Sequence, residues 1–257
     1  MPTVKDIYDF LDARAPFATQ CDWDNSGLLL GDANRQVRRV GFALDLTAQT
    51  LQQAVDEALD LLVTHHPVIF RPKRRLLSGE LVYELVRHDI AVISSHIPWD
   101  CADGGVNDVL CIALNLSNVK KIETPDTAAP LLRIGTLEHE MTPQEFAALC
   151  ARKLRTTVRL ASCGKKIKTV AVVGGAAIEF CDAAKEHGAD VFLTGDAKHH
   201  EMLDAVDSGI SVVAAGHFET EHPSMFALKE QIEQAFTSLS CLVLEEKNPV
   251  EFFGCNG

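Results

Sequence analysis

Residues 40–66, VGFALDLTAQTLQQAVDEALDLLVTHH, hold the pattern that decides the fold of this chain. An apolar run from Val40 to Leu44 precedes an amphipathic stretch from Thr47 to Leu59, and a second apolar run follows from Leu61 to Thr64. Short apolar strands separated by a helix of about ten residues indicate a βαβ unit with parallel strands. The sequence therefore predicts an α/β fold here.

The same alternation extends outward in both directions. On either side of residues 40–66 in the first half, the pattern predicts helices over 3–15, 79–88 and 105–114 and a strand over 90–94. In the second half it predicts helices over 142–154, 177–187, 197–206 and 224–236 and strands over 170–173, 191–194, 212–215 and 240–244. We therefore predict two similar α/β lobes with mostly parallel sheets.

The best candidate for a linker is the segment 124–130, which reads TPDTAAP and carries two prolines and little that could pack. It divides the chain into a first α/β lobe over residues 1–125 and a second over 126–257. A length of 257 residues is compatible with one large domain or two modest ones, and it provides ample chain for a buried core.

The balance of charge excludes some classes of partner. With 24 basic and 36 acidic residues the net charge is −12, which argues against a general binder of nucleic acid or of anionic membranes. One local exception is the run RPKRR at 71–75, which is either a basic patch or a solvated loop.

The cysteines and the apolar runs indicate the compartment. The eight cysteines form no CxxC pair, no signal peptide is visible, and no apolar run approaches the ~20 residues that a membrane span needs. We therefore expect a reducing, cytoplasmic setting without membrane association.

Histidines and acids gather where predicted strands end. Residues 92–100 (VISSHIPWD) and 212–221 (VVAAGHFETE) each run from an apolar strand into His-x-x-x-carboxylate, and adjacent histidines occur at 65–66 and 199–200. Ligands of parallel α/β sheets bind beyond the carboxyl ends of the strands, so these side chains could converge. Imidazole and carboxylate groups are the ligands of divalent transition metals. The pattern predicts a metal site, which we expect to lie between the two lobes.

Local geometry refines this prediction. A spacing of four residues would place His96 with Asp100, and His217 with Glu221, on one side of a helical turn. His65 and His66 leave a strand, so we expect them to point in roughly opposite directions and to serve different ions or faces. The structural alternative is that such histidines cap helices or satisfy hydrogen bonds in the core, as we expect of His88 and His187.

The number of ligands favours two ions. A catalytic zinc keeps three protein ligands and an open position, whereas a larger set suits two ions that share a carboxylate, for which Glu221 is the candidate. Two such ions can lower the pKa of bound water toward neutrality, which indicates hydrolysis but names no substrate. The ions could be zinc, iron, manganese or nickel.

Weaker signals leave alternatives open. Gly174-Gly175 after a predicted strand is either a phosphate cradle or a tight turn between strand and helix. Asp45 is first a helix-start residue and second a catalytic acid. The remaining candidates for a pocket wall or for residues that support the ligands are His96, Asp196, His199 and His200.

The chain resembles the Nif-three-like family, whose members form hexamers with a dinuclear metal centre and are often labelled GTP cyclohydrolase I type 2 homologues. The matching motifs run from end to end and are Trp23-Asp-Asn-Ser-Gly27-Leu28, Ala43-Leu-Asp45, Thr64-His-His-Pro67 with Phe70, His96-x-x-x-Asp100, Gly104-Gly-Val-Asn-Asp108, Thr194-Gly-Asp196 with His199-His200, Gly216-His217-x-x-x-Glu221 and Asn248-Pro249.

The resemblance implies a two-lobed α/β protomer, a toroidal homohexamer and five metal ligands. These ligands fall on His65, His66, Asp100, His217 and Glu221. His96 matches a position near the site that is not one of the usual five.

The chain departs from the family pattern at Ile97-Pro-Trp99, where relatives usually carry Thr-Asn and an apolar residue, and at Gly174-Gly-Ala-Ala, where a third glycine is common. The first departure could alter the pocket wall, and the second weakens the phosphate cradle.

Three functions remain open from the sequence. The first is a dinuclear metal-dependent hydrolase of a nucleotide or of another small molecule that bears a phosphate or amide, and the second is GTP ring opening. The third is a metal-stabilised hexameric adaptor that binds protein partners and has no activity.

Overall fold

The computed structural model describes residues 1–124 and 128–252, and it groups them into two compact units. The first contains Met1–Val109, Glu123–Leu131 and His222–Glu245, and the second contains Leu110–Ile122, Leu132–Glu221 and Glu246–Gly257. The predicted linker lies partly outside the described residues, at 125–127, and Cys255 lies outside them entirely.

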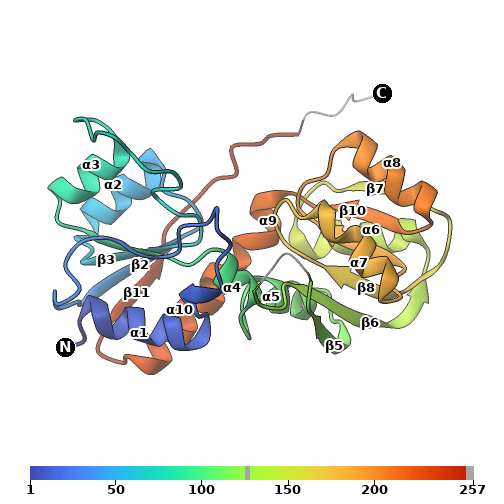
Figure 1. The fold of residues 1–257 in the computed structure, drawn as a ribbon, viewed down its shortest axis with the longest axis horizontal. Coiled ribbons are helices and arrows are strands. Elements are labelled where there is room, and N and C mark those ends of the chain that lie inside the picture. The colour runs from blue at the N-terminus through green and yellow to red at the C-terminus, as the bar shows by residue number, and fades with distance from the viewer. Residues whose placement is uncertain (125–127, 253–257) are drawn as a thin grey trace. The chain divides into compact units, whose positions relative to one another are not determined.

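The first unit is a five-stranded sheet with helices on both faces (Figure 1). The strand order is β1-β4-β3-β2-β11, and all neighbours are parallel except β1 and β4. The strands are β1 (Gly27–Leu30), β2 (Arg39–Ala43), β3 (Leu61–Thr64), β4 (Ala91–Ser94) and β11 (Ser240–Val243). The helices are α1 (Val4–Arg14), α2 (Ala48–Asp56), α3 (Leu81–Arg87), α4 (Ile97–Cys101) and α10 (Pro223–Ala235), with a 3-10 turn, η1 (Phe17–Thr19). Helix α5 (Val106–Ala113) begins here and continues in the second unit.

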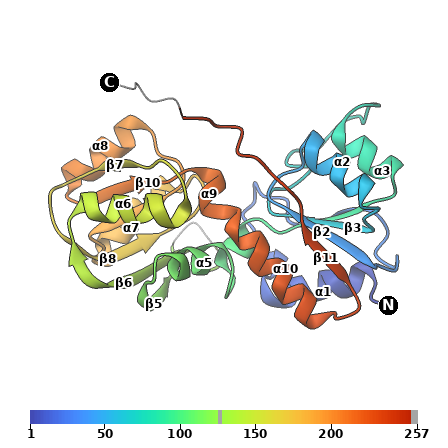
Figure 2. The same cartoon turned by 180° about the vertical axis from the view of Figure 1, so that it is seen from behind.

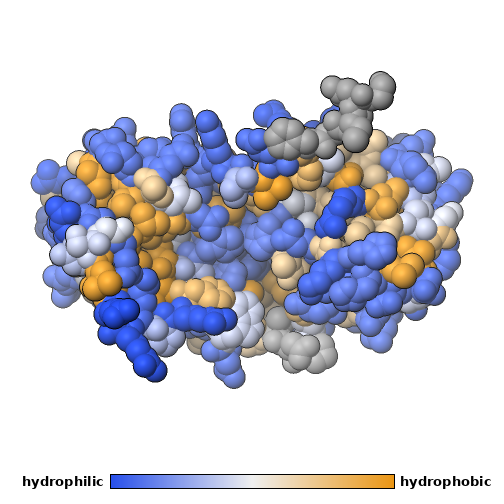
Figure 3. Space-filling model, turned by 90° about the horizontal axis from the view of Figure 1, so that it is seen from above, coloured by the Kyte–Doolittle hydropathy of each residue, from blue (hydrophilic) through white to orange (hydrophobic). Residues whose placement is uncertain are grey.

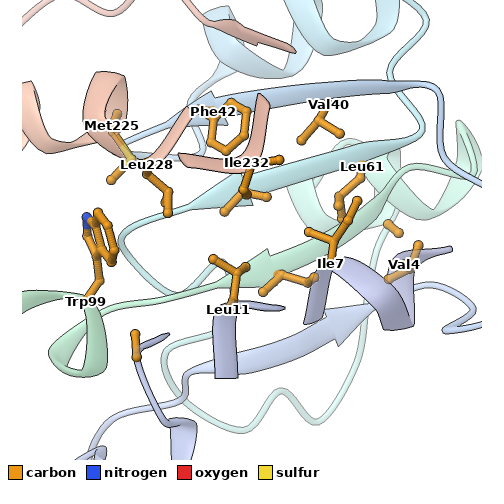
Figure 4. Packing of buried hydrophobic residues seen from close by; sticks show 14 of the residues in the cluster. Val4, Ile7, Leu11, Val40, Phe42, Leu61, Trp99, Met225, Leu228 and Ile232 are labelled. Carbon is orange, nitrogen blue, oxygen red and sulfur yellow. The ribbon is translucent and has the colours of Figure 1, made fainter. Parts of the chain in front are cut away.

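The core of the first unit follows from the alternation of side chains along its strands. Val40 and Phe42 of β2 belong to the core cluster that also contains Leu11 of α1 and Ile232 of α10, and Figure 4 shows Phe42 beside Ile232. Gly41, between them, faces the opposite side, where a Cβ would strike the side chain of Leu59. The predicted βαβ unit over residues 40–66 is therefore confirmed, with both faces of its sheet buried.

Residues 222–245, close to the end of the chain, belong to the first unit. Strand β11 pairs in parallel with β2, with Cys241 opposite Val40, and α10 packs on the same sheet. A single boundary at residue 125 does not describe this division. The sequence pattern indicates that 240–244 is a strand, but strand pairing over about two hundred residues leaves no local signal.

The second unit is a six-stranded mixed sheet in the order β5-β6-β8-β9-β10-β7. Its strands are β5 (Ser117–Ile122), β6 (Leu132–Met141), β7 (Arg159–Ala161), β8 (Ile167–Val172), β9 (Val191–Thr194) and β10 (Ser211–Ala214). Its helices are α6 (Pro143–Leu154), α7 (Cys181–Glu186), α8 (His199–Ser208) and α9 (His217–Glu221), with a 3-10 turn, η2 (Ile178–Phe180). Figure 2 shows α6 and α5 on the near face, whose apolar residues form one core cluster with the sheet.

The prediction of two α/β lobes is confirmed, but the second sheet contains more antiparallel pairing than the pattern indicated. Only β8, β9 and β10 run parallel, while β5, β6 and β7 pair antiparallel with their neighbours. Strand β5 reads SNVKKI and is exposed along most of its length, so it has no buried alternation to detect. Lysines on such a strand are typical of a protected sheet edge.

On the face that Figure 3 shows, hydrophilic and hydrophobic residues are mixed in both units. Across the described ranges, 1–124 and 128–252, no helix is both long enough and apolar enough to cross a membrane.

Candidate metal centre

His65 and His66 lie together directly after β3. The strand ends at Thr64, the backbone bends through both histidines, and their ring centroids are 5.0 Å apart. The prediction that the two rings point in opposite directions is wrong, because side chains alternate between faces only while the backbone stays extended. His65 is fully buried, and a quarter of the His66 side chain is exposed.

His96 adds a third imidazole to this pair. It follows β4, and its ring centroid lies 5.1 Å from that of His65 and 5.5 Å from that of His66. One ring nitrogen of each of the three lies within 4.8 Å of the others, which is close enough for a shared metal ion. His96 therefore lies in the same cluster as His65 and His66, although the family resemblance does not include it among the five metal ligands.

Asp100 supplies a carboxylate beside the same cluster. It lies in α4, and its Oδ1 is 3.6 Å from Nε2 of His65, with only 9% of its side chain exposed. His96 is the N-cap of α4, and its Nδ1 bonds to Asp24. In this segment Asp100 therefore lies beside His65, whereas His96 precedes the helix as its N-cap residue and is bonded to Asp24.

Each clustered histidine is held at Nδ1 by an oxygen. The pairs are His65 with the Ser95 carbonyl (3.0 Å), His66 with Asp45 (2.8 Å), His96 with Asp24 (2.9 Å) and, in the second unit, His217 with Asp196 (2.9 Å). A carbonyl or carboxylate oxygen only accepts, so Nδ1 carries the proton and a neutral ring keeps its lone pair on Nε2. This is the arrangement of metal-binding histidines, in which the outer oxygen fixes the tautomer and orients the ring.

Asp24 and Asp45 support the histidines, and the sequence pattern does not predict this role for either acid. The helix-start reading of Asp45 is wrong, because the N-cap of α2 is Thr47. The Asp24 side chain is fully buried and accepts hydrogen bonds from Asn25 N–H (2.7 Å) and Ser26 Oγ (3.0 Å). Burial alone would raise the pKa of the Asp24 carboxyl, but the hydrogen bond from His96, the charge of that ring when it is protonated, and those two donors hold it below its usual value.

The second unit has its own pair of candidate ligands, His217 and Glu221, both in α9. His217 Nε2 lies 3.1 Å from Glu221 Oε2, so the four-residue spacing places both groups on one side of the helix, as predicted. Only 3% of Glu221 is exposed. A buried carboxylate facing the lone pair of an imidazole suits a cation between or beside the two groups.

The glycine turn at 174–175 supports these ligands. A Cβ at Gly175, which has a φ of +67°, would strike the Glu221 carboxylate and lie 3.4 Å from His217 Nε2. Its N–H donates to Thr220 Oγ1 (3.1 Å), and its carbonyl accepts from the N–H groups of Gly195 and Asp196. Because the Gly175 N–H already donates to Thr220, it is not directed at a phosphate, and the structure favours a tight turn between strand and helix over a phosphate cradle.

His199 and His200 lie apart from these ligands. Both are exposed at the start of α8, and in the described ranges neither belongs to a group of side chains that could share a metal ion. A pocket of about 280 Å³ in the second unit is lined by Asp196 and His217, and neither His199 nor His200 contributes to its wall. Their role as supporting residues stays a prediction.

Removing the Asp196 carboxylate should weaken metal binding without unfolding the protein. Asp196 orients His217, and its side chain is 57% exposed, so Asp196→Ala should cost little stability. Loss of such a support costs roughly 10- to 100-fold in metal affinity. Competition with a chromogenic chelator measures this affinity, and Asp204→Ala, an exposed acid on α8, is the control. Equal affinities of the two variants would contradict the assigned role of Asp196.

Comparison with known proteins agrees with this architecture. The family model for Duf34/NIF3 (NGG1p interacting factor 3) matches residues 2–249. A Clostridium perfringens protein named GTP cyclohydrolase 1 type 2 homolog is 30% identical over 259 residues, which cover 97% of this chain and 99% of that protein. A Streptomyces coelicolor protein of the same name is 35% identical over 237 residues, covering 87% and 83% of the two chains.

A solved structure shows the same fold. The crystal structure of Staphylococcus aureus hypothetical protein SA1388 superposes with a TM-score of 0.86 at 27% identity, covering 98% of this chain and 99% of that one. With the match of the family model over nearly its whole length, this chain belongs to the Duf34/NIF3 family.

Proposed function

We propose that this protein is a dinuclear metal-dependent hydrolase whose ions are held by His65, His66, Asp100, His217 and Glu221. The observation that carries the proposal is that Nδ1 of His65, His66 and His217 is hydrogen-bonded to an oxygen. The lone pair of each neutral ring then lies on Nε2, which is the atom that would bind an ion. Divalent ions held there would lower the pKa of bound water and polarise a substrate oxygen. The residues of the chain bind and orient the ions, and Asp45 and Asp196 keep two of the imidazoles in the ligating tautomer.

The substrate class in this proposal is a nucleotide or another small molecule that bears a phosphate or an amide. Its support is the name of the relatives, which are called GTP cyclohydrolase 1 type 2 homologs. Ring opening of GTP is one member of this class, and release of formate from GTP tests it directly.

The test is turnover by protein loaded with zinc, iron, manganese or nickel, assayed against nucleotides and generic phosphodiesters. We expect activity that His65→Ala abolishes and that His187→Ala leaves unchanged, because His187 caps the end of α7 and bonds the Ala183 carbonyl. Turnover that survives His65→Ala, or none with any of the metals, would contradict the hydrolase proposal. Elemental analysis should find two ions per chain.

A second candidate is a metal-stabilised homohexameric adaptor without activity, and the description of the family as an interacting factor favours it. Ions that bind only the folded state add their binding free energy to its stability. In this case chelation should lower the melting temperature or dissociate the oligomer, measured by light scattering, while wild-type protein turns over none of the substrates.

A further inference from the structure

Two aromatic side chains lie exposed beside the histidine cluster of the first unit. Trp23 is 56% exposed and Phe70 46%, their ring centroids are 6.0 Å apart, and their planes are inclined by 34°. The ring of His96 meets both edge-on, at 5.7 Å from Trp23 and 6.3 Å from Phe70. Single apolar residues on a surface are common, but a paired Trp and Phe next to candidate metal ligands points to an interaction.

Partly buried hydrogen bonds hold this aromatic pair in place. Asp24, next to Trp23, bonds Nδ1 of His96 at 2.9 Å, and Asn25 Nδ2 donates to the Ile69 carbonyl at 2.6 Å. The loop that carries Trp23 is thereby tied both to His96 and to the segment that carries Phe70. A surface fixed in this way loses little conformational entropy when it binds a ligand.

The basic run at 71–75 begins directly after Phe70. All residues from 71 to 75 are exposed, and Lys73 is paired with Glu80 at 2.7 Å. In the part of the chain that the structure describes, no carboxylate lies within ion-pair distance of Arg71, Arg74 or Arg75. In a chain of net charge −12, three arginines outside ion pairs form a local attraction for anions, although Glu80 lies near enough to Arg75 for that charge to lower the pKa of the Glu80 carboxyl.

We propose that Trp23 and Phe70 stack on the aromatic base of a nucleotide, and that Arg71, Arg74 and Arg75 attract its phosphate. Aromatic side chains bind the face of any base, and guanidinium groups suit phosphate. A purely apolar partner would make no use of the arginines. The inference rests on the proposed function. It narrows the substrate class, which also included other small molecules that bear a phosphate or an amide, to nucleotides.

Tryptophan fluorescence reports directly on the pair of Trp23 and Phe70, which we call the aromatic platform. The chain has two tryptophans, and Trp99 is fully buried, so quenching by a ligand that Trp23→Phe abolishes arises at Trp23. The probes are GMP, AMP and ribose 5-phosphate, titrated into full-length protein with and without metal. We expect quenching by GMP and AMP and none by ribose 5-phosphate.

Affinities from calorimetry separate the two parts of the proposal. Trp23→Ala should weaken GMP binding by roughly 5- to 150-fold, the range for removal of one base-stacking side chain. Phe226→Ala, another exposed aromatic of the first unit, should leave it unchanged. Replacing Arg71, Arg74 and Arg75 with Gln should weaken the binding of GMP but not that of guanosine. The control, Arg152→Gln combined with Lys153→Gln, should change the affinity for neither ligand.

Three results would overturn the inference. The first is quenching by ribose 5-phosphate that equals the quenching by GMP. The second is an unchanged GMP affinity in Trp23→Ala. The third is an unchanged GMP affinity together with a smaller oligomer in Trp23→Ala, which would show that the pair is a self-association surface. Because the binding readouts need no turnover, quenching without activity would sink only the hydrolase proposal. Conversely, activity with the same kcat/KM for nucleotides in Trp23→Ala would sink only the platform.

Discussion

Glu221→Gln should lower the affinity for divalent metal by more than roughly 100-fold, beyond the 10- to 100-fold that loss of a supporting residue costs. The substitution keeps the shape of the side chain but removes the charge that faces His217 Nε2 at 3.1 Å in a position that is 3% exposed. A neutral amide at that place ligates a cation far more weakly than a carboxylate does. Calorimetric titration with zinc, after chelator treatment, measures the change.

The matched control is Glu219→Gln in the same short helix. Glu219 accepts a hydrogen bond from Asn248 Nδ2 at 2.8 Å and lies outside the candidate ligand set. Its variant should bind metal like the wild type. If Glu221→Gln also retained wild-type affinity and stoichiometry, Glu221 would not be a ligand, and the proposal of a shared carboxylate would fail.

Gly175→Ala should damage both metal binding and stability. The added Cβ would strike the Glu221 carboxylate, so that side chain must leave its place beside His217. In addition, the φ of +67° is costly for any residue with a Cβ, by roughly 1–2 kcal/mol. We expect a loss of metal affinity of at least roughly tenfold, comparable with the loss of a supporting residue, together with a lower melting temperature.

Gly164→Ala separates these two effects. Gly164 has a φ of +81° in the same unit, and nothing lies within 4 Å of the place that a Cβ would take, so the substitution carries the backbone cost alone. It should lower the unfolding free energy by a similar amount while leaving metal affinity unchanged. Equal metal affinity of the two variants would show that the Gly175 turn does not position Glu221.

Much of the candidate site could be predicted because strand ends are visible in the sequence. Apolar runs that stop at His65 or shortly before Asp100 and His217 mark the edge at which ligands of an α/β sheet gather. The four-residue spacing of His217 and Glu221 predicted their contact, since a helical turn leaves little choice.

Asp196 was among the predicted candidates for a supporting residue, but Asp24 and Asp45 could not be predicted, because they act over long separations. Asp24 bonds a histidine that lies 72 residues away, and Asp45 bonds one that lies 21 residues away. Neither acid belongs to a local pattern that distinguishes it from an ordinary turn or helix-start residue. The approach of His65 to His66 was also hidden, since it depends on the bend after β3.

The return of the chain to the first sheet has a consequence for biosynthesis. The first unit lacks α10 and β11 until residue 245 has been made, although its first 109 residues are synthesised much earlier. At 5–20 residues per second the ribosome needs roughly 7 to 27 seconds to cross that interval. During this time β2 has an unpaired edge, and the apolar residues that later meet Leu228 and Ile232 stay uncovered. The nascent chain is therefore a natural client for chaperones that bind exposed apolar segments.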